Sequence, residues 1–242
     1  MQPIENTGYT ALTILSKANR FNRWMYEAIK PHLTDNVLEI GSGIGNISSF
    51  ILQDFNTVTL SDIDDFYLQK LKTNFQQQSQ ASEFLSINLQ MKSFKIVYKD
   101  LKEKFDSLVL LNVLEHLPDD NYALENCKFL LKPKGTLIIL VPAYKFLFSR
   151  MDKELHHFRR YTAKSLRKKI AAQSFQINKS FYFNLLGIFA WLYGKIFKLK
   201  VLPSSEMNVF NRLVPLGRLL DKIVFQRTGL STIVIAKKIS PN

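Results

Sequence analysis

The segment VLEIGSGIGN, residues 37–46, carries the strongest structural signal in the chain. A short apolar run containing the acidic residue Glu39 leads into glycines at alternate positions, Gly41, Gly43 and Gly45. Glycine lets the chain turn tightly and lets a ligand approach the backbone, because no Cβ stands between them. The segment therefore predicts a strand, a ligand-binding turn and a helix, in that order.

The glycine spacing excludes two nucleotide-binding motifs. The dinucleotide fingerprint G-x-G-x-x-G requires glycine where Asn46 stands, which disfavours NAD or FAD. A P-loop is excluded because G-x-x-x-x-G-K-[ST] is absent from the sequence. The pattern that remains is E-x-G-x-G-x-G over residues 39–45.

Short apolar runs alternate with amphipathic helical stretches from residue 36 onward. Parallel strands need crossover helices, and fully buried strands have continuous apolar runs. This alternation therefore predicts an α/β fold with a mainly parallel sheet. The predicted strands are NVLEI (36–40), TVTLS (57–61), FKIVY (94–98), DSLVLLN (106–112) and TLIILVP (136–142), with helices at about 46–53, 66–78 and 121–131.

Further elements are expected before and after this alternating region. The sequence predicts one domain over residues 1–242, divided into N-terminal helices (1–35), a cofactor-binding core (36–142) and a basic substrate-side part (143–242). Helical spacing over residues 9–30 ends at Pro31. The later elements are a helix at about 163–173 after the N-cap Thr162, a strand FQINKSFYF, a helix at about 207–225 and a final strand STIVIAKK.

Composition indicates an ordinary globular protein. Of the 242 residues, 46% are hydrophobic and 22% are charged. The single cysteine, Cys127, can form neither an internal disulfide nor a cysteine-based zinc cluster. The start of the chain, MQPIENTGYTALTIL, lacks the charged and apolar blocks of a secretory signal, so a cytoplasmic location is expected.

Positive charge is concentrated in the second part of the chain. Residues 1–142 hold 14 Lys and Arg against 16 Asp and Glu, whereas residues 143–242 hold 19 against 4. This asymmetry favours an anionic partner, such as a phosphate, a lipid headgroup or nucleic acid; a merely solvated basic face is the alternative. The apolar run 185–194, followed by lysines, is interpreted either as a lid over an acceptor pocket or as a helix at an anionic membrane surface.

The E-x-G-x-G-x-G pattern resembles the first motif of class I S-adenosylmethionine-dependent methyltransferases. The resemblance implies a Rossmann-like seven-stranded sheet with an antiparallel last strand, and a helical insertion before that strand. It extends to an acid after the second strand, an acid in YKDL, the segment LNVLEHLPDD (111–120) and LKPKGTLIILVP (131–142). The implied S-adenosylmethionine contacts are Glu39, Gly41, Ser42, Gly43, Gly45, Asp62, Ile63, Asp100, Leu101, Asn112 and Glu115.

The segment MDKELHHFRRYTAKSL, residues 151–166, resembles the D-x-x-L-G-H-x-R-R-Y-T stretch of methyltransferases that often accompany glycosyltransferases. His156 occupies the glycine position of that pattern, a departure that affects the expected backbone geometry there. The segments YFNLLG and NRLVPLGRLLD extend the resemblance more loosely.

Six residues are candidates for catalysis or acceptor binding. A histidine near its ordinary pKa is a natural base for a hydroxyl acceptor, so His157 is the first candidate and His116 the second. A role in fixing the local structure is the alternative for each. Tyr161 could orient the substrate or pack at a helix start. Arg159 and Arg160 could bind a phosphate or carboxylate, or be a solvated pair, and Tyr144 is a further substrate-side candidate.

No metal is expected, because Asp119, Asp120 and Asn121 read as a helix N-terminus. The leading functional hypothesis is methyl transfer to a small-molecule, sugar or lipid-linked acceptor, at oxygen. An RNA methyltransferase is the first alternative, although NVLEHLPD lacks the aromatic platform of base-directed enzymes and argues against nucleic acid. The second alternative is a non-catalytic partner of a glycosyltransferase. The oligomeric state is left open.

Overall fold

The computed structural model describes residues 7–240 and places a seven-stranded sheet in the order β3-β2-β1-β4-β5-β7-β6. Neighbouring strands from β3 to β5 are parallel, whereas β7 runs antiparallel to both β5 and β6. The predicted mainly parallel sheet with an antiparallel last strand is thus confirmed. The strands are β1 (Asn36–Ile40), β2 (Thr57–Ser61), β3 (Ala81–Leu85), β4 (Phe105–Leu111), β5 (Leu131–Pro142), β6 (Phe175–Phe183) and β7 (Ser231–Lys238).

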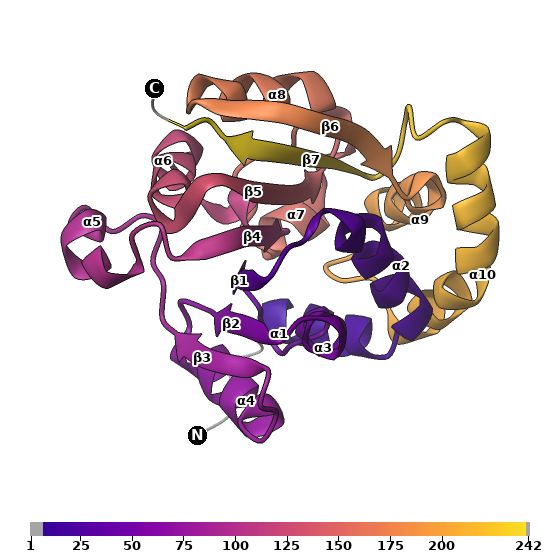
Figure 1. Ribbon diagram of the computed structural model, residues 1–242. Coiled ribbons are helices and arrows are strands. Elements are labelled where there is room, and N and C mark those ends of the chain that lie inside the picture. Colours follow the sequence, from indigo (N-terminus) through magenta and orange to yellow (C-terminus); the bar gives the residue numbers. More distant parts are fainter. Residues whose placement is uncertain (1–6, 241–242) are drawn as a thin grey trace.

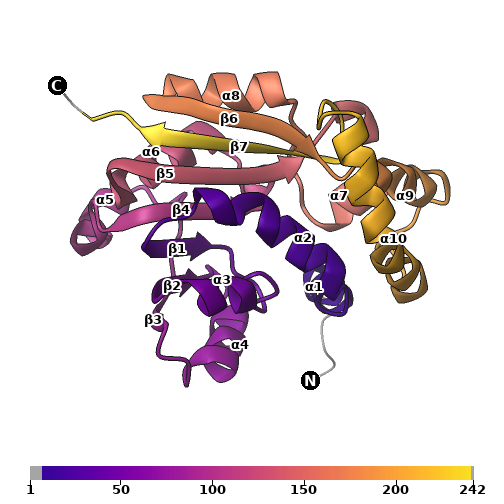
Figure 2. The same ribbon diagram turned by 45° about the vertical axis from the view of Figure 1, so that its right-hand side comes forward.

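Helices cover both faces of the sheet, as Figures 1 and 2 show. Successive strand residues point to opposite faces, so Val37 lies in the core beneath α2 and α3, and Leu38 in the core beneath α6 and α8. The helices are α1 (Thr7–Ser16), α2 (Asn19–Ile29), α3 (Ser48–Asp54), α4 (Asp65–Phe75), α5 (Phe94–Val97), α6 (Asp120–Leu130), α7 (Arg150–Glu154), α8 (Ala163–Ala172), α9 (Leu185–Ile196) and α10 (Ser204–Ile223), with short 3-10 turns η1 (Lys30–His32), η2 (Lys99–Leu101), η3 (Leu114–His116) and η4 (Lys145–Leu147).

The helices α9 and α10 follow β6 and precede β7, which confirms the predicted helical insertion before the last strand. They lie beside the N-terminal helices (Figure 2). Phe210 of α10 packs edge-on against Phe21 of α2, with ring centroids 5.4 Å apart. The helical stretch predicted over residues 9–30 is two helices, which meet at the buried Ala18.

The predicted strand FKIVY is wrong, because α5 occupies this segment. Only Phe94 is buried there, whereas Ile96 is 76% exposed and Val97 is 54% exposed. The third strand is the more polar segment ASEFL, which forms β3 at the edge of the sheet. An edge strand has a neighbour on one side only, so it does not need a continuous apolar run.

Candidate functional site

The carboxyl ends of β1, β2 and β4 lie side by side at one edge of the sheet. In the register of the parallel pairs, Ile40 is opposite both Ser61 and Leu110. The loops that follow these strands therefore meet at this edge. Open α/β sheets bind ligands at the carboxyl ends of their strands.

The loop after β1 forms the glycine-lined turn that the sequence predicts. Gly41, Gly43 and Gly45 have φ values of +71°, +57° and +90°. A Cβ at Gly41 would overlap the side chain of Val113, and one at Gly45 would overlap the ring of Phe75. Glycine is therefore required here both by backbone conformation and by space, and a ligand can approach the backbone closely.

Glu39 and Ser42 fix this loop to its surroundings. The Ser42 amide donates to the Ser61 carbonyl at 2.9 Å, and its hydroxyl donates to the Glu39 carbonyl at 3.2 Å. The Glu39 carboxyl is buried and accepts a hydrogen bond from the Ser48 hydroxyl at the start of α3. Burial raises the pKa of Glu39 to about 7, against the opposing effect of the hydrogen bonds from Ser48 and Ser42.

Asp62 stands directly after β2 and faces the glycine loop. Its carboxylate accepts hydrogen bonds from the Gly43 amide at 2.9 Å and from the Asp64 amide at 3.1 Å. Burial raises the pKa of Asp62 above the ordinary value for aspartate. Ile63 beside it is 59% exposed and offers an apolar surface at the same edge. A bidentate acceptor next to a glycine turn fits a nucleoside with two ribose hydroxyls.

The sequence-based placement of Asp100 and Leu101 is wrong. β3 ends at Leu85, and these two residues lie in η2, well beyond that strand end. The segment FKIVY, predicted to be the third strand, forms α5 instead. Two polar residues follow the true end of β3: Ser86 directly after it, and Asn88, whose Oδ1 accepts from the Gln90 amide at 2.9 Å.

The loop after β4 brings a buried acid to the same edge. Asn112 has a φ of +54° and its amide donates to the Leu140 carbonyl at 2.8 Å, which turns the chain into η3. Glu115 in η3 is 0% exposed, and neither of its carboxylate oxygens has a hydrogen-bond partner among the described residues. Burial raises the pKa of Glu115 to about 8.

His157 is held beside this acid by Asp152 of α7. The Nδ1 atom of His157 lies 3.0 Å from an Asp152 carboxylate oxygen, which also accepts from Nε of Arg160 at 2.8 Å. Burial raises the pKa of Asp152, but the hydrogen bonds from His157 and Arg160 and the charge of Arg160 outweigh it, so the pKa lies below its usual value. The rings of His116 and His157 meet edge to face, with centroids 4.6 Å apart. Burial and the nearby His157 lower the pKa of His116 to about 4.

Arg159 and Arg160, which are predicted to bind the acceptor, both have partners within the chain. The Arg160 guanidinium is buried, donates to the Ala143 carbonyl at 2.9 Å and lies over the Trp191 ring, 4.5 Å from its centroid. Arg159 pairs with Asp120 at 3.1 Å and donates to two backbone carbonyls, those of Leu117 and Pro118. Both arginines hold the loop around His157 in place.

Tyr161 and Tyr144 are also engaged inside the fold. The Tyr161 hydroxyl donates to Asp120 at 2.8 Å, and burial raises its pKa above the ordinary tyrosine value. Tyr161 therefore packs at the start of α8. The Tyr144 hydroxyl lies 2.9 Å from that of Thr228, and its ring stacks on Tyr182 at 5.1 Å between centroids.

Two parts of the site were not predicted from the sequence. Asp152 stands at the first position of the D-x-x-L pattern, but no role followed from the pattern itself. The helix α1 lies over the glycine loop, where the Leu12 side chain faces Gly43 and the Leu12 carbonyl accepts from Nδ2 of Asn46 at 3.0 Å. The glycine-like position His156 does adopt a left-handed conformation, with a φ of +59°.

Comparison with known proteins relates the segment that forms this edge of the sheet to methyltransferase domains. A family profile described as a methyltransferase domain matches residues 38–137, which span the glycine loop and the strands β1 to β4. The matched residues 38–137 carry a class I S-adenosylmethionine-dependent methyltransferase domain. The cofactor of the methyltransferase domain is S-adenosylmethionine, which the glycine turn and Asp62 fit.

Curated relatives of the methyltransferase domain include the ubiquinone biosynthesis O-methyltransferase of Coxiella burnetii. It is 26% identical over 138 residues, covering 52% of this chain and 56% of the relative. The chain thus matches about half the length of this relative. A polyketide synthase of Dictyostelium discoideum is 29% identical over 138 residues, covering 49% of this chain and 5% of the synthase.

Solved structures share the fold of the methyltransferase domain. A chain from the complex between the Haloferax volcanii Trm112 methyltransferase activator and a methyltransferase has a TM-score of 0.65 at 14% identity, covering 98% of both chains. An S-adenosylmethionine-dependent methyltransferase from Methanosarcina mazei has a TM-score of 0.57 at 17% identity, covering 88% of this chain and 98% of its own. At such identities the likeness concerns the fold alone.

Proposed function

We propose that the protein transfers a methyl group from S-adenosylmethionine to an oxygen atom of a small-molecule, sugar or lipid-linked acceptor. When bound, the cofactor supplies an electrophilic methyl group on a good leaving group. The glycine turn and Asp62 would hold the cofactor along the ends of β1 and β2. The observation that supports oxygen as the acceptor is the Asp152–His157 pair beside the end of β4.

His157 is the proposed catalytic residue, meeting the acceptor through Nε2. Asp152 accepts a hydrogen bond from the protonated Nδ1 of His157, so Nε2 keeps a free lone pair. Such a nitrogen can take the proton of an acceptor hydroxyl as the oxygen attacks the methyl group. His116 is the weaker candidate, because its lowered pKa makes it a poorer base at neutral pH.

Replacing His157 with glutamine is expected to reduce methyl transfer to a hydroxyl acceptor by about 100-fold or more, the usual contribution of a positioned base. The measurement is transfer of a labelled methyl group to a panel of phenols, sugars and lipid-linked sugars. The exposed neighbour His156 provides the matched control variant, His156→Gln, which should keep full activity. Unchanged turnover in the His157 variant would contradict this role.

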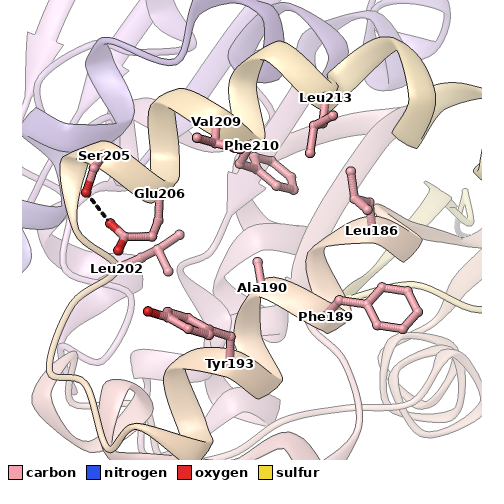
Figure 3. Close-up of a pocket in the computed structure, with 10 residues that line it drawn as sticks. All are labelled: Leu186, Phe189, Ala190, Tyr193, Leu202, Ser205, Glu206, Val209, Phe210 and Leu213. Carbon is pink, nitrogen blue, oxygen red and sulfur yellow. Dashed lines mark hydrogen bonds between the residues drawn. The ribbon is translucent and has the colours of Figure 1, made fainter.

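An apolar groove between α9 and α10 supports a lipid-linked acceptor (Figure 3). Its volume is about 410 Å³, and several of its apolar side chains are exposed, with Phe189 at 61% and Val209 at 56%. Exposed apolar side chains that gather in one patch mark a ligand or interaction surface. The groove is lined by Leu186, Phe189, Ala190, Tyr193, Leu202, Ser205, Glu206, Val209, Phe210 and Leu213.

The helix α9, which lines the groove, also contacts the surroundings of the proposed catalytic histidine. Trp191 of α9 donates from its indole nitrogen to the Leu147 carbonyl at 3.1 Å, and its ring lies beneath Arg160, the partner of Asp152. One helix therefore contacts the His157 surroundings on one side and lines the groove on another. This arrangement suits an acceptor with a polar head at His157 and an apolar tail along α9.

We further infer that the α9–α10 face rests on an anionic membrane surface. Exposed lysines and arginines stand beside its apolar side chains, including Lys198, Lys200, Arg212 and Lys222. An apolar face flanked by basic residues binds at the interface of anionic lipid. Among the helices of residues 7–240, none combines the length and the apolar character needed to cross a bilayer.

Sedimentation with phosphatidylglycerol vesicles is expected to carry the protein down at low salt and less of it at high salt, because salt screens the basic residues. Val209→Asp should weaken this binding, because it places a charge in the apolar face. Ile96→Asp is the matched control, since Ile96 is 76% exposed on α5. If the protein sediments with the vesicles at neither salt concentration, the membrane proposal is refuted.

A further inference from the structure

We propose that Glu115, His116 and His157 form a binding site for a divalent transition-metal ion of the zinc type. One potential ligand atom from each side chain lies within 4.8 Å of those of the other two. Two imidazoles and one carboxylate form a donor set that binds zinc and leaves a further coordination position open. The acids that follow η3 are not part of this cluster, since Asp119 there caps α6.

The unpartnered carboxylate of Glu115 is the second observation that supports this site. Glu115 is 0% exposed, yet neither oxygen accepts a hydrogen bond from any residue between 7 and 240. Buried polar atoms are almost always partnered, and a buried carboxylate is costly without a donor or a cation. An ion bound between Glu115 and the two histidines would supply the missing partner.

The neighbouring charges leave Glu115 without an opposite charge of its own. The charge of Arg160 acts on it, but Arg160 is paired with Asp152 at 2.8 Å, both side chains are fully buried, and no residue between 7 and 240 accepts a hydrogen bond from Nη2 of Arg160. Two carboxylates thus share one guanidinium in this buried region. A divalent cation would give the Glu115 carboxylate a positive partner of its own.

His157 has the orientation typical of a metal ligand. Its Nδ1 lies 3.0 Å from Asp152, and this carboxylate–histidine contact is the arrangement that fixes a ligating imidazole through its other nitrogen. Ligand bonds of about 2.1 Å put two ligands of one ion roughly 3 to 4 Å apart. Small side-chain rotations would therefore be enough to close the three donors around an ion.

An ion at this position would stand next to the acceptor. Its open coordination position could take the acceptor oxygen and lower the pKa of the hydroxyl; Nε2 of His157 would then bind the ion instead of taking the proton, which would leave to solvent. This consequence rests on the proposed function, but the binding of the ion does not.

The test is calorimetric titration of chelator-treated, dialysed protein with zinc chloride, together with the visible spectrum on addition of cobalt chloride. We expect one ion per chain and cobalt absorption bands of low-symmetry coordination. Glu115→Gln and His157→Gln should each weaken zinc binding by more than about 100-fold, beyond what loss of an outer-shell contact usually costs. Thermal unfolding of the metal-free variants confirms that they are folded.

His156→Gln is the matched control, because His156 is exposed and adjacent in sequence. The proposal is overturned if the parent binds no zinc, or if His156→Gln weakens binding as much as His157→Gln does. Titration of the same samples with S-adenosylhomocysteine reports on the cofactor edge separately. If the protein binds S-adenosylhomocysteine but no zinc, the metal site is rejected and the proposed function stands. If it binds zinc but no S-adenosylhomocysteine, the proposed function is rejected and the metal site stands.

Discussion

Replacing Asp152 with asparagine is expected to lower the free energy of unfolding by about 3 to 5 kcal/mol, the cost of leaving one charge of a buried pair without its partner. The Asp152 and Arg160 side chains are both 0% exposed and lie 2.8 Å apart. Asp152 also accepts from the Ser149 amide at 2.8 Å and faces Nδ1 of His157. Only a carboxylate has enough acceptor sites for all these donors; an asparagine would direct an NH2 group at one of them.

Urea unfolding at neutral pH measures this loss. Glu154→Gln is the matched control two residues along the chain, because its ion pair with Arg150 at 3.2 Å is half-exposed. An exposed pair of this kind contributes less than about 1 kcal/mol. Equal losses in the two variants would show that the buried pair contributes no more than a surface pair.

Asp62→Ala is expected to weaken the binding of S-adenosylmethionine and S-adenosylhomocysteine by at least about 100-fold. A hydrogen bond to a charged acceptor contributes about 1.5 to 3 kcal/mol, and each 1.4 kcal/mol corresponds to a tenfold change in affinity. A carboxylate that accepts both ribose hydroxyls makes two such bonds. The variant also loses the hydrogen bond from the Gly43 amide to Asp62, which loosens the glycine turn.

Calorimetric titration of both variants and the parent gives these affinities directly. Asp65→Ala serves as the control, since Asp65 is exposed in the first turn of α4 and only three residues away. It should bind the cofactor as the parent does. Undiminished affinity in Asp62→Ala would place the nucleoside elsewhere on the sheet edge.

The sequence was informative wherever burial on both faces dictates residue type. NVLEI, TVTLS and STIVIAKK coincide with β1, β2 and β7, because these strands lie inside the sheet and have apolar runs. At the edge this rule fails: ASEFL carries polar residues yet forms β3. FKIVY shows the opposite case. Its β-branched residues predict a strand, but they lie at exposed positions of the short helix α5.

The backbone geometry of the glycine turn could be predicted from the sequence, but the long-range pairing of side chains could not. The glycine turn and Asp62 follow from local sequence, because φ and strand ends are local properties. The roles of Asp152 and Arg160 depend on which buried groups meet across the fold, and no spacing in the sequence encodes that the two side chains are buried together. From the sequence alone, two consecutive arginines are expected to be solvated, because their buried partners are distant in the chain.

The position of β7 has a consequence for how the protein is made. This strand is the last of the seven along the chain, yet it lies between β5 and β6. Until residues 231–238 leave the ribosome, β6 has no hydrogen-bonded neighbour and β5 presents an open edge. Exposed strand edges pair readily with other chains, so the nascent chain passes through an aggregation-prone stage that ends only when its final strand inserts.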